Sequence, residues 1–201
     1  MTQPAGDGFH RHFLVAAAMF CFVFFMVLGF WPPPRRQVRE EARATEAFRL
    51  HHRKYHDVIA QISGLLDTIH HVSEMQQLEL MAVTVSVVRG DLLPHARAEE
   101  QFLYPAADRR AGTDSPVFTA TLRFEHRLLE RWTEELAAVA SEPFPDHNAF
   151  CLRGERLLGL LEAHLAAEEE VLLPMLDKTM TPEEFRREVE RGMGIGKGAL
   201  P

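Results

Sequence analysis

The sequence contains few cysteines and no excess of positive charge, and these two absences exclude several classes of protein. It has two cysteines in 201 residues, Cys21 in an apolar run and Cys151 far from it. Two such distant thiols supply neither a disulfide framework nor a cysteine-based zinc site. The net charge is −7, so no basic surface for a nucleic-acid partner is expected.

A sustained alternation of apolar and polar residues, the mark of a half-buried strand, is also missing. From Phe48 to Ile69, apolar and aromatic residues recur instead at steps of four and three, which is the stripe of an amphipathic helix. Three further helices are expected at about 73–106, 117–140 and 147–176, with a weak bend or break at Gly90 and Pro94. Short loops, one of them A-G-T-D-S-P at 111–116, make neighbours antiparallel. The prediction is an all-α, antiparallel four-helix bundle.

Residues 13–31 carry no charged side chain. Nineteen apolar residues in a helix span roughly 28 Å, about the thickness of the hydrocarbon layer of a membrane. A cleaved signal peptide usually has a shorter apolar core and a small-residue cleavage site, whereas this run ends in Gly29, Phe30 and Trp31 before three prolines. An uncleaved transmembrane anchor is therefore favoured.

The residues around this run define the remaining organisation. Arginines are denser after the run than before it, so the C-terminal domain is expected to face the cytoplasm as part of a single-pass membrane protein. A polar tail (1–12) precedes the anchor, and a Pro-rich, charged linker (32–47) follows it. After the bundle, residues 177–201 are expected to form a short helix, opened by a T-P-E-E capping box, and a Gly-rich tail.

One segment occurs twice. Residues 95–105 read H-A-R-A-E-E-Q-F-L-Y-P, and residues 164–174 read H-L-A-A-E-E-E-V-L-L-P. Positions i and i+4 share a helix face, so His95 with Glu99, and His164 with Glu168, each direct an imidazole and a carboxylate to one point. These groups are ligands for first-row transition metals.

The first and third helices add further histidines. His126 and His56 each have apolar residues at +3, +6 and +10, and they precede Pro174 and Pro105 by the similar intervals of 48 and 49 residues. This match favours His56 over His52, although His52 lies in the apolar stripe and remains the alternative. His70 and His71, near the end of the first helix, are interpreted as structural, with a fifth-histidine role at the site for one of them as the alternative.

This pattern resembles the haemerythrin-like, or HHE cation-binding, domain over residues 48–176. The resemblance implies a bundle with a non-haem di-iron centre bridged by Glu99 and Glu168. Its terminal ligands would be the histidines His56, His95, His126 and His164. Glu100, Glu169 and Glu170 are expected to lie around the ligands or at the surface, and Tyr104 to pack in the core.

The resemblance also implies a function. Family members carry or sense oxygen, handle nitric oxide or peroxide, or repair iron–sulfur clusters. Oxygen carriers hold an extra histidine where this chain has Glu130, which argues against a pure carrier. The expected function is binding of a small diatomic or peroxide at iron. The alternatives are a di-iron enzyme with peroxidase or nitric-oxide-reducing activity and a structural bundle without functional metal.

Overall fold

The computed structural model describes residues 43–112 and 116–195, all within the unit Ala42–Pro201. The predicted anchor at 13–31, the tail before it and most of the linker lie outside these residues. Across the described ranges, no helix is both long and apolar enough to cross a membrane. The same ranges contain helices and no strand, so the prediction of an all-helical bundle is confirmed.

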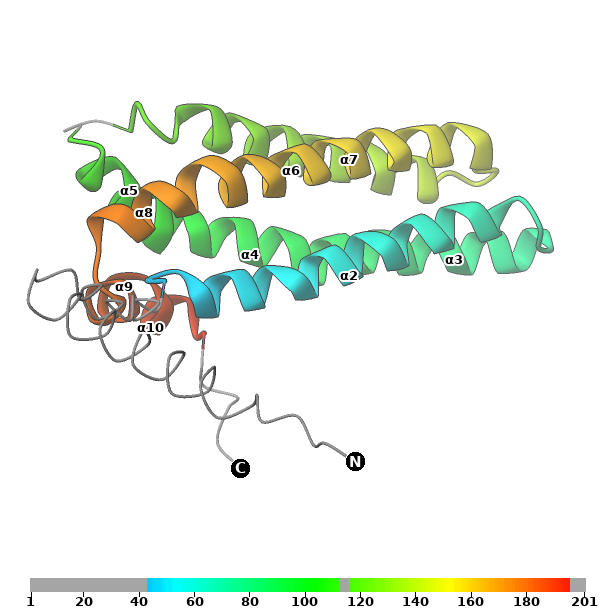
Figure 1. Ribbon diagram of the computed structural model, residues 1–201. Coiled ribbons are helices and arrows are strands. Elements are labelled where there is room, and N and C mark those ends of the chain that lie inside the picture. The colour runs from blue at the N-terminus through cyan, green and yellow to red at the C-terminus, as the bar shows by residue number, and fades with distance from the viewer. Residues whose placement is uncertain (1–42, 113–115, 196–201) are drawn as a thin grey trace, which may run out of the picture. The chain divides into compact units, whose positions relative to one another are not determined.

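Four long helical segments form the bundle (Figure 1). The first is α2 (Glu46–Ile69) and the third is α6 (Ala120–Ala140). The second joins α3 (Glu74–Val87), α4 (Leu93–Ala98) and α5 (Tyr104–Arg110), and the fourth joins α7 (His147–Ala167) and α8 (Leu173–Thr179). Both α2 and α6 contact α3 and α7, so each helix of the bundle packs against two neighbours.

Short π-helical turns join the pieces of the second and fourth segments. They span Val88–Leu92, Glu99–Leu103 and Glu168–Leu172, and each is followed by one residue and then a proline. Proline lacks an N–H and its ring clashes with the carbonyl four residues back in an α-helix, and the wider π turn relieves both problems. The second segment therefore continues through Gly90 and Pro94 without a break.

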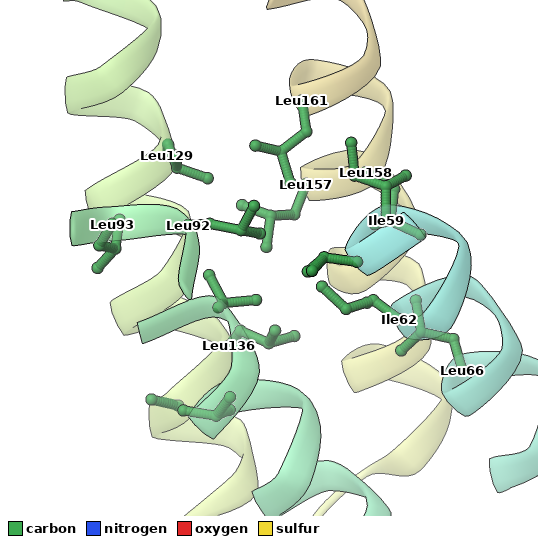
Figure 2. Packing of buried hydrophobic residues seen from close by; sticks show 14 of the residues in the cluster. Ile59, Ile62, Leu66, Leu92, Leu93, Leu129, Leu136, Leu157, Leu158 and Leu161 are labelled. Carbon is green, nitrogen blue, oxygen red and sulfur yellow. The ribbon is translucent and has the colours of Figure 1, made fainter. Parts of the chain in front are cut away.

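Apolar side chains fill the bundle in two clusters. The larger one lies toward the α2–α3 and α6–α7 loops and includes Ile62, Leu66, Leu136 and Leu157 (Figure 2). The smaller one lies at the other end and includes Phe48, Leu103, Leu172 and Phe185. On each of the four long segments, a buried His or Glu separates the residues of one cluster from those of the other: His52, Glu99, His126 and Glu168.

The start of α6 differs from the expected residue 117. Residues 117–119 form a turn, and Thr119 is tied to the end of the second segment through Asp108. Its amide donates to Asp108 Oδ1 (3.0 Å) and its hydroxyl to Asp108 Oδ2 (2.9 Å). Thr45, just before α2, donates in the same way from both groups to Asp177 Oδ1 (2.9 Å each). The two halves of the bundle thus use the same tether.

A C-terminal helical segment covers the smaller cluster. It comprises α9 (Pro182–Phe185), a π turn at Arg186–Glu190 and α10 (Arg191–Met193). The capping box is present, since Thr181 Oγ1 accepts from the Glu184 amide and Glu184 Oε2 accepts from the Thr181 amide. Phe185 and Val189 bury fully in the cluster.

Two glycines of α7 test how closely this helix packs on α2. A Cβ on Gly154 would lie 2.7 Å from Leu66 Cδ1, whereas a Cβ on Gly159 would meet nothing within 4 Å. Gly159→Ala should raise the free energy of unfolding by about 0.5–1 kcal/mol because alanine favours the helix. Gly154→Ala should lower it by about 1–3 kcal/mol because Leu66, 1% exposed in the packed core, must shift to make room. Denaturant titration of both variants measures the difference. Equal gains would show that α7 does not lie so close to α2.

Candidate metal centre

Six buried side chains from the four long segments meet between the two apolar clusters. Each is at most 8% exposed: His52, His95, Glu99, His126, His164 and Glu168. Glu99 and Glu168 are the first residues of two π turns, and their histidine partners lie one α-helical turn earlier, as the repeated segment predicts. Five of the six predicted ligand positions are therefore brought together.

The ligand atoms form two groups that share one carboxylate. His52, His95 and Glu99 make the first group, and Glu99, His126 and His164 make the second. Within each group all ligand atoms lie within 4.8 Å of one another. Glu99 Oε1 is 2.8 Å from His95 Nε2, and Glu99 Oε2 is 3.4 Å from His126 Nε2. One oxygen thus faces each group.

Glu168 is placed in a similar way on the opposite segment. Its Oε2 lies 3.5 Å from His52 Nε2, and its Oε1 lies 3.8 Å from His164 Nε2. This second carboxylate also reaches histidines of both groups, so two carboxylates lie between four imidazoles.

Three of the four imidazoles have their outward nitrogen held by a further carboxylate. Nδ1 of His126 is 3.2 Å from Glu100 Oε1, and Nδ1 of His164 is 2.9 Å from Glu125 Oε2. His52 Nδ1 is 3.2 Å from Glu169 Oε1. A carboxylate accepts, so Nδ1 carries the proton and the inward Nε2 keeps a free lone pair. This is the arrangement that orients metal-binding histidines.

His95 departs from this pattern. Its Nδ1 has no hydrogen-bond partner, and its ring stacks on Tyr55 with ring centres 3.8 Å apart. Glu125, the residue before His126, accepts from the outward nitrogen of His164. The equivalent residue before His52 is His51, which is not a carboxylate, so His95 has no such acceptor. Burial, and then repulsion by His95, lower the pKa of His51 to about 4.

The expectation that His56 faces the interior is not met. Its side chain is 48% exposed, and its Nε2 contacts Glu169 Oε1 at 3.1 Å. His52, fully buried one turn earlier, takes the position in the group. His52 follows Thr45 by seven residues, and His126 follows Thr119 by seven, with an arginine four residues after each threonine.

This repeated Thr-x-x-x-Arg-x-x-His pattern is the sequence signal for His52. Arg49 Nε donates to Thr45 Oγ1, and Arg123 Nε donates to Thr119 Oγ1. The comparison of the His-to-Pro intervals selected His56, one helical turn beyond His52. It did so because the first helical hairpin is longer than the second. It has extra residues at the end of α2 and in the second segment, including the π turn at Val88–Leu92.

Burial and the neighbouring groups shift the pKa values of the two central carboxylates in opposite directions. Burial raises the pKa of Glu168 well above its usual value, and repulsion by Glu99 adds to this rise. Burial also acts to raise the pKa of Glu99, but the nearby imidazoles of His95, His126 and His52 bring it well below the usual value.

Several buried polar atoms lack any hydrogen bond: both ring nitrogens of His95, Glu99 Oε2 and Glu168 Oε2. An unpaired buried polar atom costs free energy, whereas a cation in the centre would pair the inward ones, His95 Nε2, Glu99 Oε2 and Glu168 Oε2. The donor set of imidazole nitrogens and carboxylate oxygens also fits a transition metal. The residues therefore fit a metal centre.

Tyr104 lies in the centre, although the sequence favoured a packing role. Its hydroxyl donates to Glu168 Oε1 (2.8 Å) and lies 3.1 Å from His126 Nε2 and 3.4 Å from His164 Nε2. Burial and the two carboxylates raise the pKa of Tyr104, so it stays protonated. The equivalent residue of the other half is Leu173, also fully buried.

Other residues considered from the sequence lie outside the centre. Glu130 is an exposed partner of Arg97 at 3.2 Å. His70 and His71 are exposed at the end of α2, and Glu170 is exposed on the π turn after α7. Glu125 was missed because its partner, His164, lies 39 residues away, with no short spacing between them.

The comparisons with known proteins agree with this geometry. The profile of the family described as Hemerythrin HHE cation binding domain matches residues 43–176, about two thirds of the chain. No curated protein and no solved structure matches the sequence.

The position of the first-helix ligand can be tested with two single variants. His52→Ala should lower the amount of metal bound per chain, because His52 Nε2 faces both carboxylates. His56→Ala should keep the bound metal, because its ring lies at the surface. Elemental analysis after loading with ferrous iron measures both. Loss of metal from His56→Ala alone would contradict this placement.

Proposed function

The chain belongs to the Hemerythrin HHE cation binding domain family, and from this premise we propose that it is a non-haem di-iron protein that binds a small ligand. The ligand class is dioxygen, nitric oxide or peroxide. Bound iron would supply the coordination and redox chemistry for these molecules. His52, His95, His126 and His164 would hold two ions, with Glu99 and Glu168 between them.

The observation that carries this proposal is the sharing of Glu99 between two groups of buried ligand atoms. A single-metal site needs one such group, whereas two groups with a common carboxylate suit two ions. Two carboxylates between the ions would also offset much of their charge in a buried place where unpaired charge is costly.

The donor set supports iron as the metal. It combines imidazole and carboxylate with no thiolate, which suits iron better than a structural zinc site. The only cysteine in the described ranges, Cys151, lies away from the centre, with its Sγ 3.7 Å from the Leu66 carbonyl oxygen. If iron is held by two imidazoles and the shared carboxylates of each group, its coordination sphere would have room for a small ligand.

An enzymatic role is the second candidate, and Tyr104 favours it. The phenol O–H lies within hydrogen-bond distance of two inward histidine nitrogens and of Glu168. A protonated phenol in this place can donate a hydrogen bond or a proton to a molecule bound beside it. Peroxide turnover or nitric oxide reduction would use such a donor, whereas reversible binding alone would not require it.

We further propose that the apolar run at 13–31 anchors this domain in a membrane, with the bundle on the cytoplasmic side. The basis is the length of the run and the arginines that follow it. Alkaline carbonate extraction of membranes would leave an anchored chain in the pellet. Release of the intact chain into the supernatant would contradict the anchor.

The iron proposal is tested with variants of two nearby glutamates. The native protein should hold about two iron ions per chain and absorb in the near ultraviolet after aerobic loading. Glu168→Ala should lose most of this iron, because the buried carboxylate contacts both histidine groups. Glu170→Ala is the matched control and should keep it, because its side chain is exposed.

Two results would contradict the proposal. Equal iron loss in both variants would show that the glutamates act through overall charge and not through coordination. A native protein that binds no iron would favour a structural bundle.

A further inference from the structure

A small cavity between the second and third long segments reaches the candidate centre. Its volume is about 130 Å³, and it is lined by Ala96, Arg97, Glu100, His126, Arg127 and Glu130. One water occupies roughly 30 Å³ of liquid, so the cavity holds a few waters or one small molecule. Its size suits the ligand class proposed above.

The inner and outer walls of this cavity differ. The inner wall is the His126 ring, 4% exposed, together with Glu100, whose Oε1 lies 3.2 Å from His126 Nδ1. On the outer side, Arg97 from α4 bonds Glu130 from α6, with Nη2 and Nε at 3.2 and 3.4 Å from Glu130 Oε1. This ion pair joins the two segments across the cavity.

The Arg97–Glu130 ion pair is weak enough to open easily. The side chains of Arg97 and Glu130 are 69% and 50% exposed, and an ion pair in that setting is weak and screened by salt. Both side chains are long, so either can swing into solvent without disturbing the apolar core. By contrast, the larger cavity beside Gly90 and Ser141 has no candidate ligand among its lining residues.

We propose that this cavity is the port through which small ligands reach the His126 side of the centre, and that the Arg97–Glu130 pair is its gate. The inference rests on the proposed function, because it concerns access to the same centre. The four charged residues of the lining are two arginines and two glutamates, so their charges balance. The intact gate therefore selects by size, and removing one partner of the pair leaves the lining charged.

Gate removal is compared with removal of a matched ion pair. The double variant Arg97→Ala/Glu130→Ala opens the cavity, and Arg89→Ala/Glu134→Ala removes a pair that also reaches α6 (2.6 Å) but lies outside this cavity. Azide is mixed with iron-loaded protein in a stopped-flow spectrometer. The gate variant should bind and release azide faster by about the same factor, leaving Kd unchanged, and the control pair should leave both rates unchanged.

Single variants test the charge of the port. Glu130→Ala leaves Arg97 and Arg127 facing Glu100, so azide should bind roughly threefold faster than in the double variant. Arg97→Ala leaves Glu100 and Glu130 facing Arg127, so azide should bind correspondingly more slowly than in the double variant. Neutral nitric oxide should bind at similar rates in both, and faster than in the native protein. Unchanged azide rates in every gate variant would overturn the proposal.

A measurement on metal-free protein separates this inference from the proposed function. Diethyl pyrocarbonate modifies accessible imidazoles, and peptide mass spectrometry gives the rate at each histidine. Opening the gate should speed modification of His126 severalfold and leave that of exposed His56 unchanged. This result without iron binding would sustain the port and reject the iron proposal. Equal rates at His126 in the native and gate variants would reject the port itself.

Discussion

The burial of two carboxylates among four imidazoles is the constraint on which the rest of this structure depends. Glu99 and Glu168 lie at most 1% exposed between two apolar clusters, where unpaired charge is costly. Burial and mutual repulsion raise the pKa of Glu168, while imidazoles lower that of Glu99. The remaining unpaired inward atoms, among them His95 Nε2, are those that a metal would pair.

The surrounding bundle fixes these groups through a device that is used twice. An Asp at the end of each half ties down the Thr before the helix that carries His52 or His126 in the other half. The second Glu of each E-E pair then holds the outward nitrogen of that histidine. The two halves differ at Tyr104, whose counterpart is an apolar leucine. The polar groups at the centre are therefore not arranged symmetrically.

The sequence predicts the helices and the two His-x-x-x-Glu pairs well, because helical spacing alone brings i and i+4 together. It does not place Tyr104, because residue i+5 lies about 140° around a regular α-helix from residue i. The π turn at Glu99–Leu103 brings Tyr104 back over Glu99, and Pro105 is its only sign in the sequence. The His-to-Pro intervals do not identify His52, because the two hairpins differ in length. The structure identifies it, because Thr45 and Arg49 before His52 make the same contact as Thr119 and Arg123 before His126.

The central claim is that Glu99 lies between two metal ions. Anomalous diffraction at the iron absorption edge, from crystals of iron-loaded protein, tests it most directly. The account predicts two peaks, one beside His52 and His95 and the other beside His126 and His164, with one Glu99 oxygen directed to each. A single peak, or two peaks with Glu99 bound to neither, would contradict it.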